Sequence, residues 1–398
     1  VPHHYAIDGE GNYDSQRLLT DTGKIFTEIH NLFGSIPYED YTIFLQLRDG
    51  RRGGLEHLNS THLLTSRWAF SPDSEYREYL ELLAHELFHT YNVKRIKPES
   101  FDQYDYEREN YTDLLWIAEG LTSYYERLLL RRADLITVET YLDLLAAEIQ
   151  EIESTPGRTM QTLQEASFDA WIKYYRPNAS SPNTTVSYYT KGSLVGLALD
   201  LSLRSATQGE AGLDDVFRML WQRYREDNSG YTYAAFQAVC DTIAGQPLDD
   251  VFRYVSTTEE INWEPILEPF GLLLVRSHST PEYSAQAYYG FQTREKDGRL
   301  IVSRVDHDTP ATRAGLSVRD ELVSIDGYRL LGRNTQEILD SRKQDQEVTM
   351  VVTRDGLMRT LKIRPQSPPY DMVSIVRVEP PTEEQEALYS GWLQASWE

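Results

Sequence analysis

The sequence has few cysteines, few basic residues and no long apolar run. It contains one cysteine among 398 residues, which excludes an internal disulfide framework. Its 39 Lys and Arg residues stand against 62 Asp and Glu residues, a formal net charge of −23. Nucleic acids and anionic membranes call for a basic face on the protein. We therefore expect neither of them as a partner.

The apolar runs are too short to cross a bilayer. The longest, from Leu194 to Leu203, is broken by Asp200. The chain begins at Val1, and no charged segment followed by an apolar one opens it. We expect no signal peptide and no transmembrane segment in this chain. Low cysteine use leaves cytoplasm and periplasm equally open.

The patterns that are present indicate two folded units. Apolar periodicity predicts a helix over 15–33 and mostly helical structure over about 74–151, 191–225 and 233–255. After about residue 256, short strand-like runs are separated by Asp-Gly turns. We predict an α+β chain with four parts: a first unit over 1–255 that is mostly α-helical in its second half, a connecting segment over 256–284, a β-rich unit over 285–366, and a tail over 367–398 that ends in a packed helix.

The strongest local signal is the segment His85-Glu86-Leu87-Phe88-His89 inside a predicted helix. Positions i and i+4 share one helix face, so both imidazoles can reach the same ion, and neutral imidazole suits Zn²⁺. Glu86 lies one step round that face, where a carboxylate can take a proton from water. The alternative is a helical histidine pair without a metal, so a third ligand is needed to decide.

A candidate third ligand, Glu119, stands in the apolar helical run Trp116–Thr122. Burying an unpaired carboxylate is costly, and a Zn²⁺ ion would be its partner. Two histidines and one glutamate with an open fourth position make a catalytic zinc site rather than a structural one. The alternative is a salt bridge from Glu119 to Arg95 or Arg127.

Two further segments carry candidate substrate-binding groups. Gly53 and Gly54 allow an extended peptide backbone to approach closely, and Glu56 could accept hydrogen bonds from a free α-amine. The phenol of Tyr189 could donate a hydrogen bond to a developing oxyanion. The alternatives are a hairpin turn with an exposed acid at Glu56, and a packed aromatic pair at Tyr189.

Four segments together closely resemble the glycyl aminopeptidase family, which are gluzincin zinc metallopeptidases with a C-terminal PDZ domain, related to the aminopeptidase-N superfamily. They are HELFHTYNVKRIKP at 85–98, GGLEH at 53–57, WIAEGLTSYY at 116–125 and SYYTKG at 187–192. The resemblance implies a thermolysin-like catalytic domain in the first unit and a PDZ domain in the second.

The resemblance also implies roles for individual residues. One Zn²⁺ per chain would be held by His85, His89 and Glu119, with Glu86 as the general base. It further implies that Tyr189 stabilises the transition state and that Glu56 binds the substrate's N-terminal amine. Glu126 is either a partner of a zinc ligand or part of a solvent-facing ion pair, and the family motif gives no mechanism for Asn92, Lys94 and Arg95.

In the second unit, the segment Tyr289-Gly290-Phe291 resembles the carboxylate-binding loop of PDZ domains. Backbone amides near Gly290 could bind a peptide's C-terminal carboxylate while the peptide adds to the sheet as an extra strand. Gly290 and Phe291 are therefore candidate peptide-binding residues. The alternative is a PDZ domain that binds no peptide and only packs on the first unit.

These features predict a zinc-dependent aminopeptidase that acts on peptides with a free N-terminus. The family resemblance implies a preference for small N-terminal residues such as Gly or Ala. One alternative is a zinc endopeptidase, in which Glu56 binds no amine. The other is a catalytically silent protein that acts through its PDZ domain. Nothing in the sequence indicates an oligomeric state.

Overall fold

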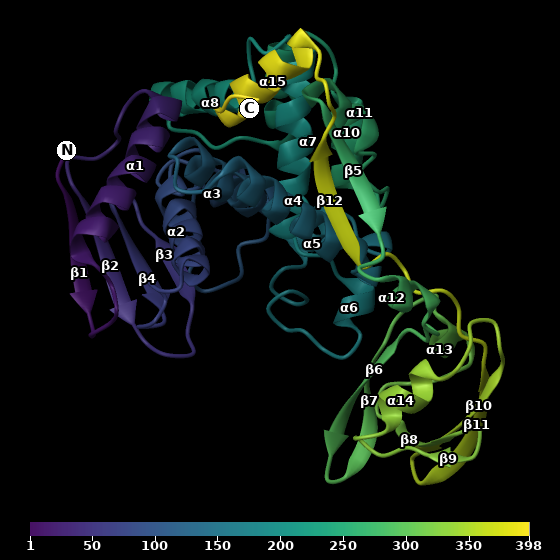
Figure 1. The fold of residues 1–398 in the computed structure, drawn as a ribbon. Coiled ribbons are helices and arrows are strands. Elements are labelled where there is room, and N and C mark those ends of the chain that lie inside the picture. The colour runs from purple at the N-terminus through teal and green to yellow at the C-terminus, as the bar shows by residue number, and fades with distance from the viewer. Residues whose placement is uncertain (398) are drawn as a thin grey trace.

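In the computed structural model, which describes residues 1–397, a four-stranded sheet forms one side of the first unit (Figure 1). The strands run in the order β1-β2-β4-β3, and the first three are parallel. Their bounds are His3–Asp8 for β1, Tyr41–Leu47 for β2, Ser60–Thr65 for β4 and Gly53–Glu56 for β3. Strand β3 pairs antiparallel with β4 alone, so its outer edge is unpaired among the described residues.

Two long helices lie beside this sheet. Helix α1 covers Ser15–Phe33, the range that the apolar spacing predicts; the Asp14 side chain accepts from the Arg17 amide at its start, and Gly34 ends it in a left-handed conformation. Helix α2, Asp73–Phe88, contacts both β3 and β4. This contact brings the end of α2 to the unpaired edge of the sheet.

The remainder of the first unit is helical. Its long helices are α3 (Leu121–Arg132), α4 (Val138–Glu153), α7 (Thr190–Ala206), α8 (Leu213–Asp227), α9 (Tyr233–Ala244) and α10 (Asp249–Ser256). Short elements join them: η1 (Glu99–Phe101), the π-helix η2 (Trp116–Gly120), η3 (Pro156–Thr159), α5 (Leu163–Phe168), α6 (Ser181–Thr184), α11 (Glu264–Leu267) and η4 (Glu268–Phe270). None of the described helices combines the length and apolar character that crossing a membrane requires.

The predicted helical stretch over 74–151 is wrong between residues 89 and 114. There the chain forms turns and loops, with η1 as its single short helix among the described residues. Tyr91 and Ile96 are buried in this segment although it is not helical. Apolar residues point inward here because tertiary hydrogen bonds fix the loop, and apolar spacing alone cannot distinguish that case from a helix.

The second unit has its own hydrophobic core and a sheet in the order β11-β10-β8-β7-β6, with β9 paired to β8. Strand β6 therefore forms one edge of this sheet. The elements of this part of the chain are α12 (Pro281–Ala285), β6 (Phe291–Lys296), β7 (Arg299–Val305), α13 (Pro310–Arg313), β8 (Glu321–Ile325), β9 (Tyr328–Arg329), α14 (Thr335–Asp340), β10 (Val348–Arg354) and β11 (Leu357–Ile363).

The tail returns to the first unit. Strand β12, Met372–Arg377, pairs antiparallel with β5, Leu272–Ser277, and helix α15, Glu383–Leu393, follows it (Figure 1). Trp392 of α15 is completely buried in the core of the first unit. Residues 256–284, predicted as a connecting segment, contribute α11, η4 and β5 to that same core. The second unit is thus an insertion between two paired strands.

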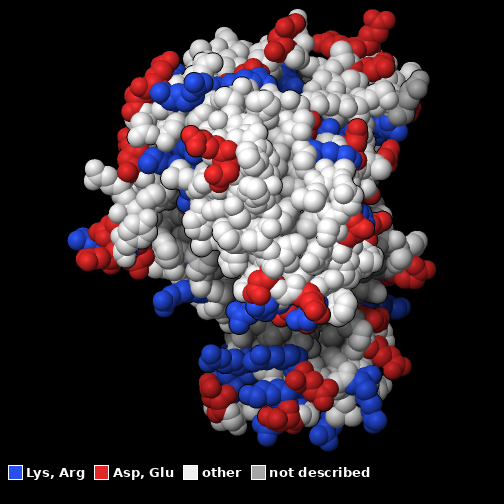
Figure 2. All heavy atoms as spheres, turned by 90° about the vertical axis from the view of Figure 1, so that its left-hand side faces the viewer, with Lys and Arg blue, Asp and Glu red and all other residues white. Residues whose placement is uncertain are grey.

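The two units also meet at Asn183 of α6. Its side-chain amide donates to the carbonyl of Val305 at 2.7 Å and accepts from the amide of His307 at 2.9 Å. On the face of the molecule drawn in Figure 2, charged side chains of both signs are scattered, and the acidic ones form no single patch. On this face, the acidic surplus is therefore spread over the surface.

Candidate active site

Helix α2 positions the two histidines of the site. His85 lies in its last turn and His89 caps its end, with the two ring centres 4.5 Å apart. Both side chains are buried. The Nε2 atoms of His85 and His89 each lie 3.2 Å from the same oxygen, Oε2 of Glu119. Helix α2 and its C-terminal cap therefore place two imidazole nitrogens beside the carboxylate of Glu119.

Glu119 lies in the π-helix η2, directly before α3. Single π-helical turns often occur at functional sites because they re-aim one side chain. Helix α7 approaches η2 very closely: a Cβ placed on Gly120 would lie 2.6 Å from the Cα of Gly192. This backbone contact brings the residues before α7, including Tyr189, towards Glu119.

The other nitrogen of each imidazole already has a partner. Nδ1 of His85 lies 2.8 Å from Oε2 of Glu126, and Nδ1 of His89 lies 2.7 Å from the backbone carbonyl of Asn92. Both partners are acceptors, so each Nδ1 carries a proton, and each Nε2, which faces Glu119, is the nitrogen left to bind a cation. Of the two roles that the sequence leaves open for Glu126, the structure shows the contact with His85.

Three possible ligand atoms thus converge: the two Nε2 atoms and Oε2 of Glu119 all lie within 4.8 Å of one another. Burial alone would raise the pKa of Glu119, but the two imidazoles lower it far below its usual range. Burial alone would lower the pKa of His85, yet its bonds to Glu119 and Glu126 raise it well above the usual value. Two imidazoles with one carboxylate fit Zn²⁺, which would replace the protons that the two Nε2 atoms otherwise hold.

Glu86 lies beside these three residues. Its carboxylate is buried, and its Oε2 has no hydrogen-bond partner among the described residues. Burial raises the pKa of Glu86 to about 7, although the charges of His89 and His85 oppose the rise. Strand β3 packs directly on this carboxylate: a Cβ on Gly54 would lie 2.0 Å from Oε1 of Glu86. Only glycine leaves room for Glu86 at this edge of the sheet.

Tyr189 also lies near the histidines, with its ring centre 6.2 Å from that of His85. Its hydroxyl is 3.5 Å from that of Tyr175, and its ring stacks on Tyr188. Burial, reinforced by the charge of Glu119, raises the pKa of Tyr189 well above its usual value. The phenol therefore stays protonated and can donate a hydrogen bond.

Glu56, at the end of β3, is the last of the predicted site residues that lie near the two histidines. Glu56, Glu86 and His89 form a second set of possible ligands whose atoms lie within 4.8 Å of one another. The Nζ atom of Lys94 lies 3.1 Å from Oε1 of Glu56. Because Lys94 already pairs with Glu56, this second set is less suited to a metal than the first.

Comparison with known proteins agrees with this geometry. The pattern of the M61 glycyl aminopeptidases matches residues 78–195, and that of PDZ domains matches residues 287–364. An aminopeptidase N family protein from Idiomarina loihiensis shares 30% sequence identity and superposes with a TM-score of 0.85, over 98% of this chain and 68% of that one. The chain belongs to the M61 glycyl aminopeptidase family. It is therefore a peptidase.

A second solved structure is less similar to this M61 peptidase. An M1 zinc metallopeptidase from Deinococcus radiodurans shares 16% identity over 65% of this chain and 48% of its own, with a TM-score of 0.42. No curated protein matches the chain. The predicted fold class is confirmed in its coarse form, a mixture of helix and sheet with a PDZ domain.

The structure brings most of the predicted site residues of the M61 peptidase together. His85, Glu86, His89, Glu119, Tyr189, Glu56 and Gly54 surround one point, and Gly53 begins the strand beside them. Neither Arg95 nor Arg127 pairs with Glu119: Arg95 donates to backbone carbonyls, and Arg127 pairs with other glutamates. The salt-bridge alternative for Glu119 is therefore not observed.

Sequence reasoning left three motif residues without a mechanism, and the structure supplies contacts for each. Asn92 donates from its side chain to the carbonyls of Ile117 and Ala118, next to Glu119. Arg95 donates to the carbonyl of Leu58 in the turn after β3, and Lys94 pairs with Glu56. The sequence motif includes all three residues. It could not predict their contacts, because their partners lie about 25 to 40 positions away in the chain and no local pattern indicates them.

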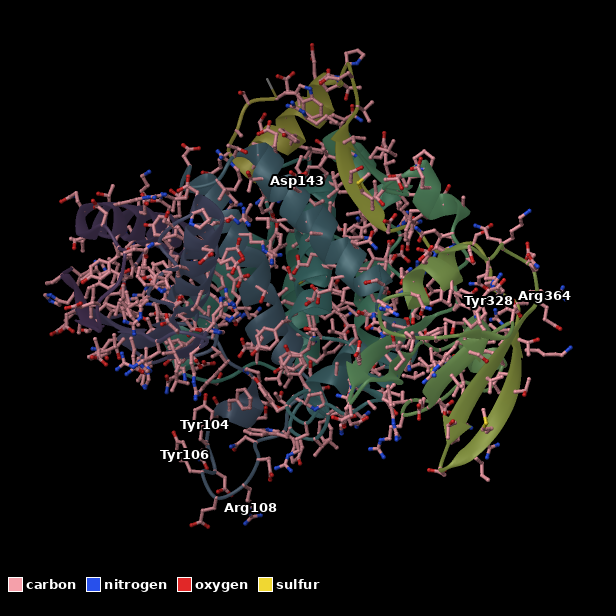
Figure 3. The ribbon with its side chains drawn as sticks, turned by 60° about the horizontal axis from the view of Figure 1, so that its bottom comes forward. Tyr104, Tyr106, Arg108, Asp143, Tyr328 and Arg364 are labelled. Carbon is pink, nitrogen blue, oxygen red and sulfur yellow. The ribbon has the colours of Figure 1, made fainter. Side chains whose placement is uncertain are left out.

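One loop beyond this motif projects from the first unit. Figure 3 shows Tyr104, Tyr106 and Arg108 on it. Burial raises the pKa of Tyr104, and the charges of Lys94 and Glu56 both act on its phenol. The base of this loop is thus close to the Lys94–Glu56 pair.

The two PDZ candidates lie in the second unit. Gly290 has a positive φ of 81°, and a Cβ there would lie 2.2 Å from Cβ of Thr309. Its carbonyl accepts from the amide of Asp306 at 2.9 Å. Phe291 begins β6, the edge strand. Gly290 therefore fixes the start of the sheet edge that could accept another strand.

Proposed function

We propose that this chain is a zinc-dependent aminopeptidase with a thermolysin-like catalytic unit, and that it prefers small N-terminal residues such as Gly or Ala. The observation that carries the proposal is the convergence of the His85 and His89 Nε2 atoms on Glu119, with both Nδ1 atoms already bonded. Membership in the M61 glycyl aminopeptidase family supports the substrate class.

His85, His89 and Glu119 would hold the zinc ion. When bound, zinc supplies Lewis acidity, which makes water more acidic and a peptide carbonyl more electrophilic near neutral pH. Glu126 and the Asn92 carbonyl fix the orientation of the two imidazoles and keep their Nε2 lone pairs directed inward. These contacts prepare the site before any ligand arrives.

Glu86 acts as the general base. Its free oxygen, Oε2, takes a proton from the attacking water and later returns it to the leaving amine. Tyr189 donates its phenolic hydrogen to the oxygen on which negative charge develops. Both side chains are buried or half-buried, which strengthens their electrostatic effect on the reacting atoms.

The edge of β3 binds the substrate backbone. Its outer side has no strand partner among the described residues, and Gly54 lets a peptide approach Glu86 closely. Glu56 at the end of this strand receives the α-amine of the substrate, and Lys94 keeps the Glu56 carboxylate in place. An amine bound at that position sets the first peptide bond against Glu86.

A panel of peptides with free and N-acetylated termini tests this proposal, each assayed with and without a chelator. Free peptides should be cleaved faster by a factor on the order of 10⁴, because the half-buried Glu56 carboxylate binds a free amine and is left unpaired by the blocked analogue. Glu56→Gln should raise KM for free peptides and leave blocked ones unchanged. Comparable cleavage of both would instead favour the endopeptidase.

The general-base role has its own test. Glu86→Gln keeps the shape of the side chain but cannot take a proton, so turnover should fall below detection while the metal content stays unchanged. Near wild-type turnover in this variant would contradict the assignment. A wild-type protein without turnover or bound metal would instead favour the silent PDZ protein.

For the second unit we propose peptide binding along β6. A peptide's C-terminal carboxylate would meet the backbone amides of the Tyr289–Phe291 loop. In the described part of the chain, no strand pairs with the outer side of β6, and this supports peptide binding over a domain that only packs on the first unit.

A further inference from the structure

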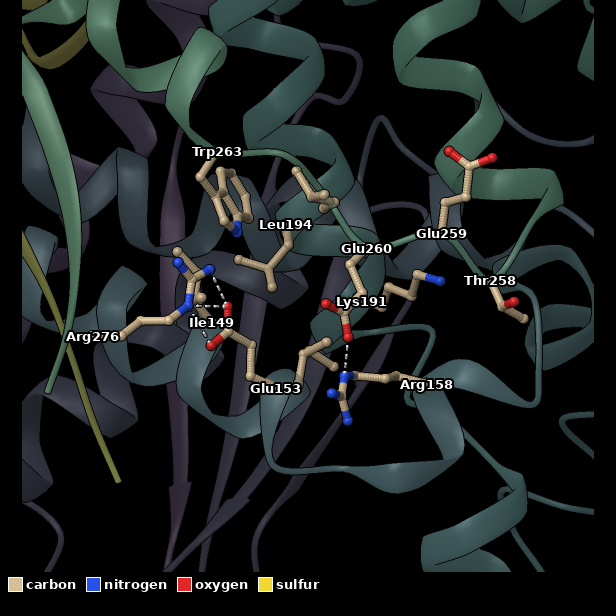
Figure 4. A pocket seen from close by; sticks show the side chains of 12 residues that line it. Ile149, Glu153, Arg158, Lys191, Leu194, Thr258, Glu259, Glu260, Trp263 and Arg276 are labelled. Carbon is tan, nitrogen blue, oxygen red and sulfur yellow. Dashed lines mark hydrogen bonds and ion pairs between the residues drawn. The ribbon is translucent and has the colours of Figure 1, made fainter. Parts of the chain in front are cut away.

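A small cavity of about 50 Å³ lies beside the first turn of α7 (Figure 4). Part of its wall is apolar, formed by Ile149, Leu194 and Trp263. Lys191, two residues after Tyr189, lines it as well. None of these side chains has a role in the proposed catalytic cycle.

Lys191 is an isolated buried cation. Its side chain is 3% exposed, and Nζ has no hydrogen-bond partner among the described residues. Buried charges in proteins are normally paired, because leaving water without compensation is costly. Burial lowers the pKa of Lys191 to about 8, although the charge of Glu260 acts in the opposite direction. An ammonium at this position therefore has the nearby charge of Glu260 but no direct hydrogen-bond partner among the described residues.

The acidic residues that line the cavity already form ion pairs with arginines. Glu153 receives three hydrogen bonds from Arg276, and Glu260 receives one from Arg158 at 2.8 Å; Figure 4 draws both pairs. The third acid, Glu259, pairs with Arg253 outside the cavity at 3.3 Å. Each carboxylate thus pairs directly with an arginine, and none of the three bonds to the ammonium of Lys191.

We propose that this cavity binds one monovalent anion of the size of chloride, with the ammonium of Lys191 as its principal partner. About 10–15 Å³ of such space admits one water molecule, so a cavity of about 50 Å³ has room for a single small ion. Apolar walls favour a weakly hydrated halide over sulfate or phosphate, whose removal from water costs more. The site stands on the geometry of Lys191 and its neighbours and does not depend on the proposed peptidase cycle.

The anion would also stabilise the first turn of α7. In that turn, Ser193 donates to Glu148, which pairs with Arg127. Arg127 in turn lies 4.0 Å from Glu126, the partner of His85. An anion bound at Lys191 is therefore linked to the candidate metal site through a series of buried contacts.

Crystals grown in sodium bromide test the site directly, because bromide gives an anomalous signal. The expected result is a bromide peak within hydrogen-bond distance of Lys191 Nζ in the wild type and no peak there in Lys191→Met. Methionine is an unbranched side chain of similar length that carries no charge. A wild-type cavity that contains only water, or a peak that persists in Lys191→Met, overturns the proposal.

Thermal unfolding gives a second readout that needs no catalytic activity. Replacing gluconate by chloride at constant ionic strength should raise Tm of the wild type by about 2 °C. The same replacement should not change Tm of Lys191→Met. Lys173→Met is the matched control, since Lys173 is half-exposed and pairs with Asp169; it should respond like the wild type. Equal chloride responses in the wild type and Lys191→Met would overturn the proposal.

Discussion

At the scale of single residues, the site is organised by pairs in which one group fixes another. Glu126 fixes His85, the Asn92 carbonyl fixes His89, and Lys94 fixes Glu56. Orienting partners of this kind are worth about 10- to 100-fold in metal affinity or activity. The reactive groups of the site therefore depend on neighbours that never touch the substrate.

The closest approach in the site involves Gly54, and it gives a residue-scale prediction. In Gly54→Ala, the new methyl would lie 2.0 Å from Oε1 of Glu86 and must displace that carboxylate. A displacement of about 1 Å of a catalytic group costs roughly 10²-fold in rate, so kcat should fall by at least that factor. Steady-state kinetics on an alanyl peptide measure the effect.

The neighbouring glycine provides the control. A Cβ on Gly53 meets no atom within 4 Å, so Gly53→Ala should keep kcat close to that of the wild type. Circular dichroism and metal content should be unchanged in both variants. A Gly54→Ala enzyme with wild-type kcat would mean that Glu86 does not need its present position.

At the scale of elements, the site lies where α2, the π-helix η2 and the start of α7 meet beside strand β3. Asn92 joins two of these elements. Its side-chain nitrogen donates to Ile117 O at 2.9 Å, Ala118 O at 3.2 Å and Thr122 Oγ1 at 3.0 Å. One buried amide therefore connects the loop after α2 to the helix that carries Glu119.

Asn92→Ala should destabilise the protein and weaken metal binding. It leaves buried acceptors unsatisfied, which costs about 1–3 kcal/mol of unfolding free energy. The accompanying shift of Glu119 should lower zinc affinity by about 10- to 100-fold. Denaturant unfolding and zinc titration measure these two effects. Asn31→Ala, at an exposed site on α1, should change neither; unchanged zinc affinity in Asn92→Ala would contradict the account.

The sequence predicted those parts of the site that depend on local spacing. His85 and His89 share a helix face, and Glu119 stands in an apolar run, so both signals lie within a few residues. The pairing of Lys94 with Glu56 joins positions 38 apart, and nothing in either segment indicates the other. The π-helical turn at Glu119 was also not predictable, because tertiary contacts select it over a regular helix.

At the scale of the whole molecule, the second unit is inserted between β5 and β12 of the first. Its ends are close together: the amide of Tyr288 donates to Gln366 O at 2.9 Å, and the amide of Gln366 donates to Tyr288 O at 3.0 Å. The tail then buries Tyr389 and Trp392 in the core of the first unit. The sequence indicates a packed terminal helix, but strand β12 and its long-range pairing leave no local signal.

This arrangement predicts that the PDZ domain can be removed and the tail cannot. Joining Tyr288 to Gln366 through an Asn-Gly turn should give a folded, active peptidase, because the turn spans the same distance as the paired residues. Ending the chain at Gln366 removes β12 and α15 and should give insoluble protein. Solubility, Tm and cleavage of a short peptide distinguish the two variants. If the variant that joins Tyr288 to Gln366 does not fold, the PDZ domain is not a separable insertion.

The most direct test of the account is the metal content of protein purified without chelators. We predict one zinc ion per chain in the wild type and in Glu86→Gln, and almost none in a variant with both His89→Ala and Glu119→Ala. Elemental mass spectrometry measures all three. A wild-type protein without zinc, or a double variant that keeps its full zinc content, would contradict the assignment of His85, His89 and Glu119 as the ligands.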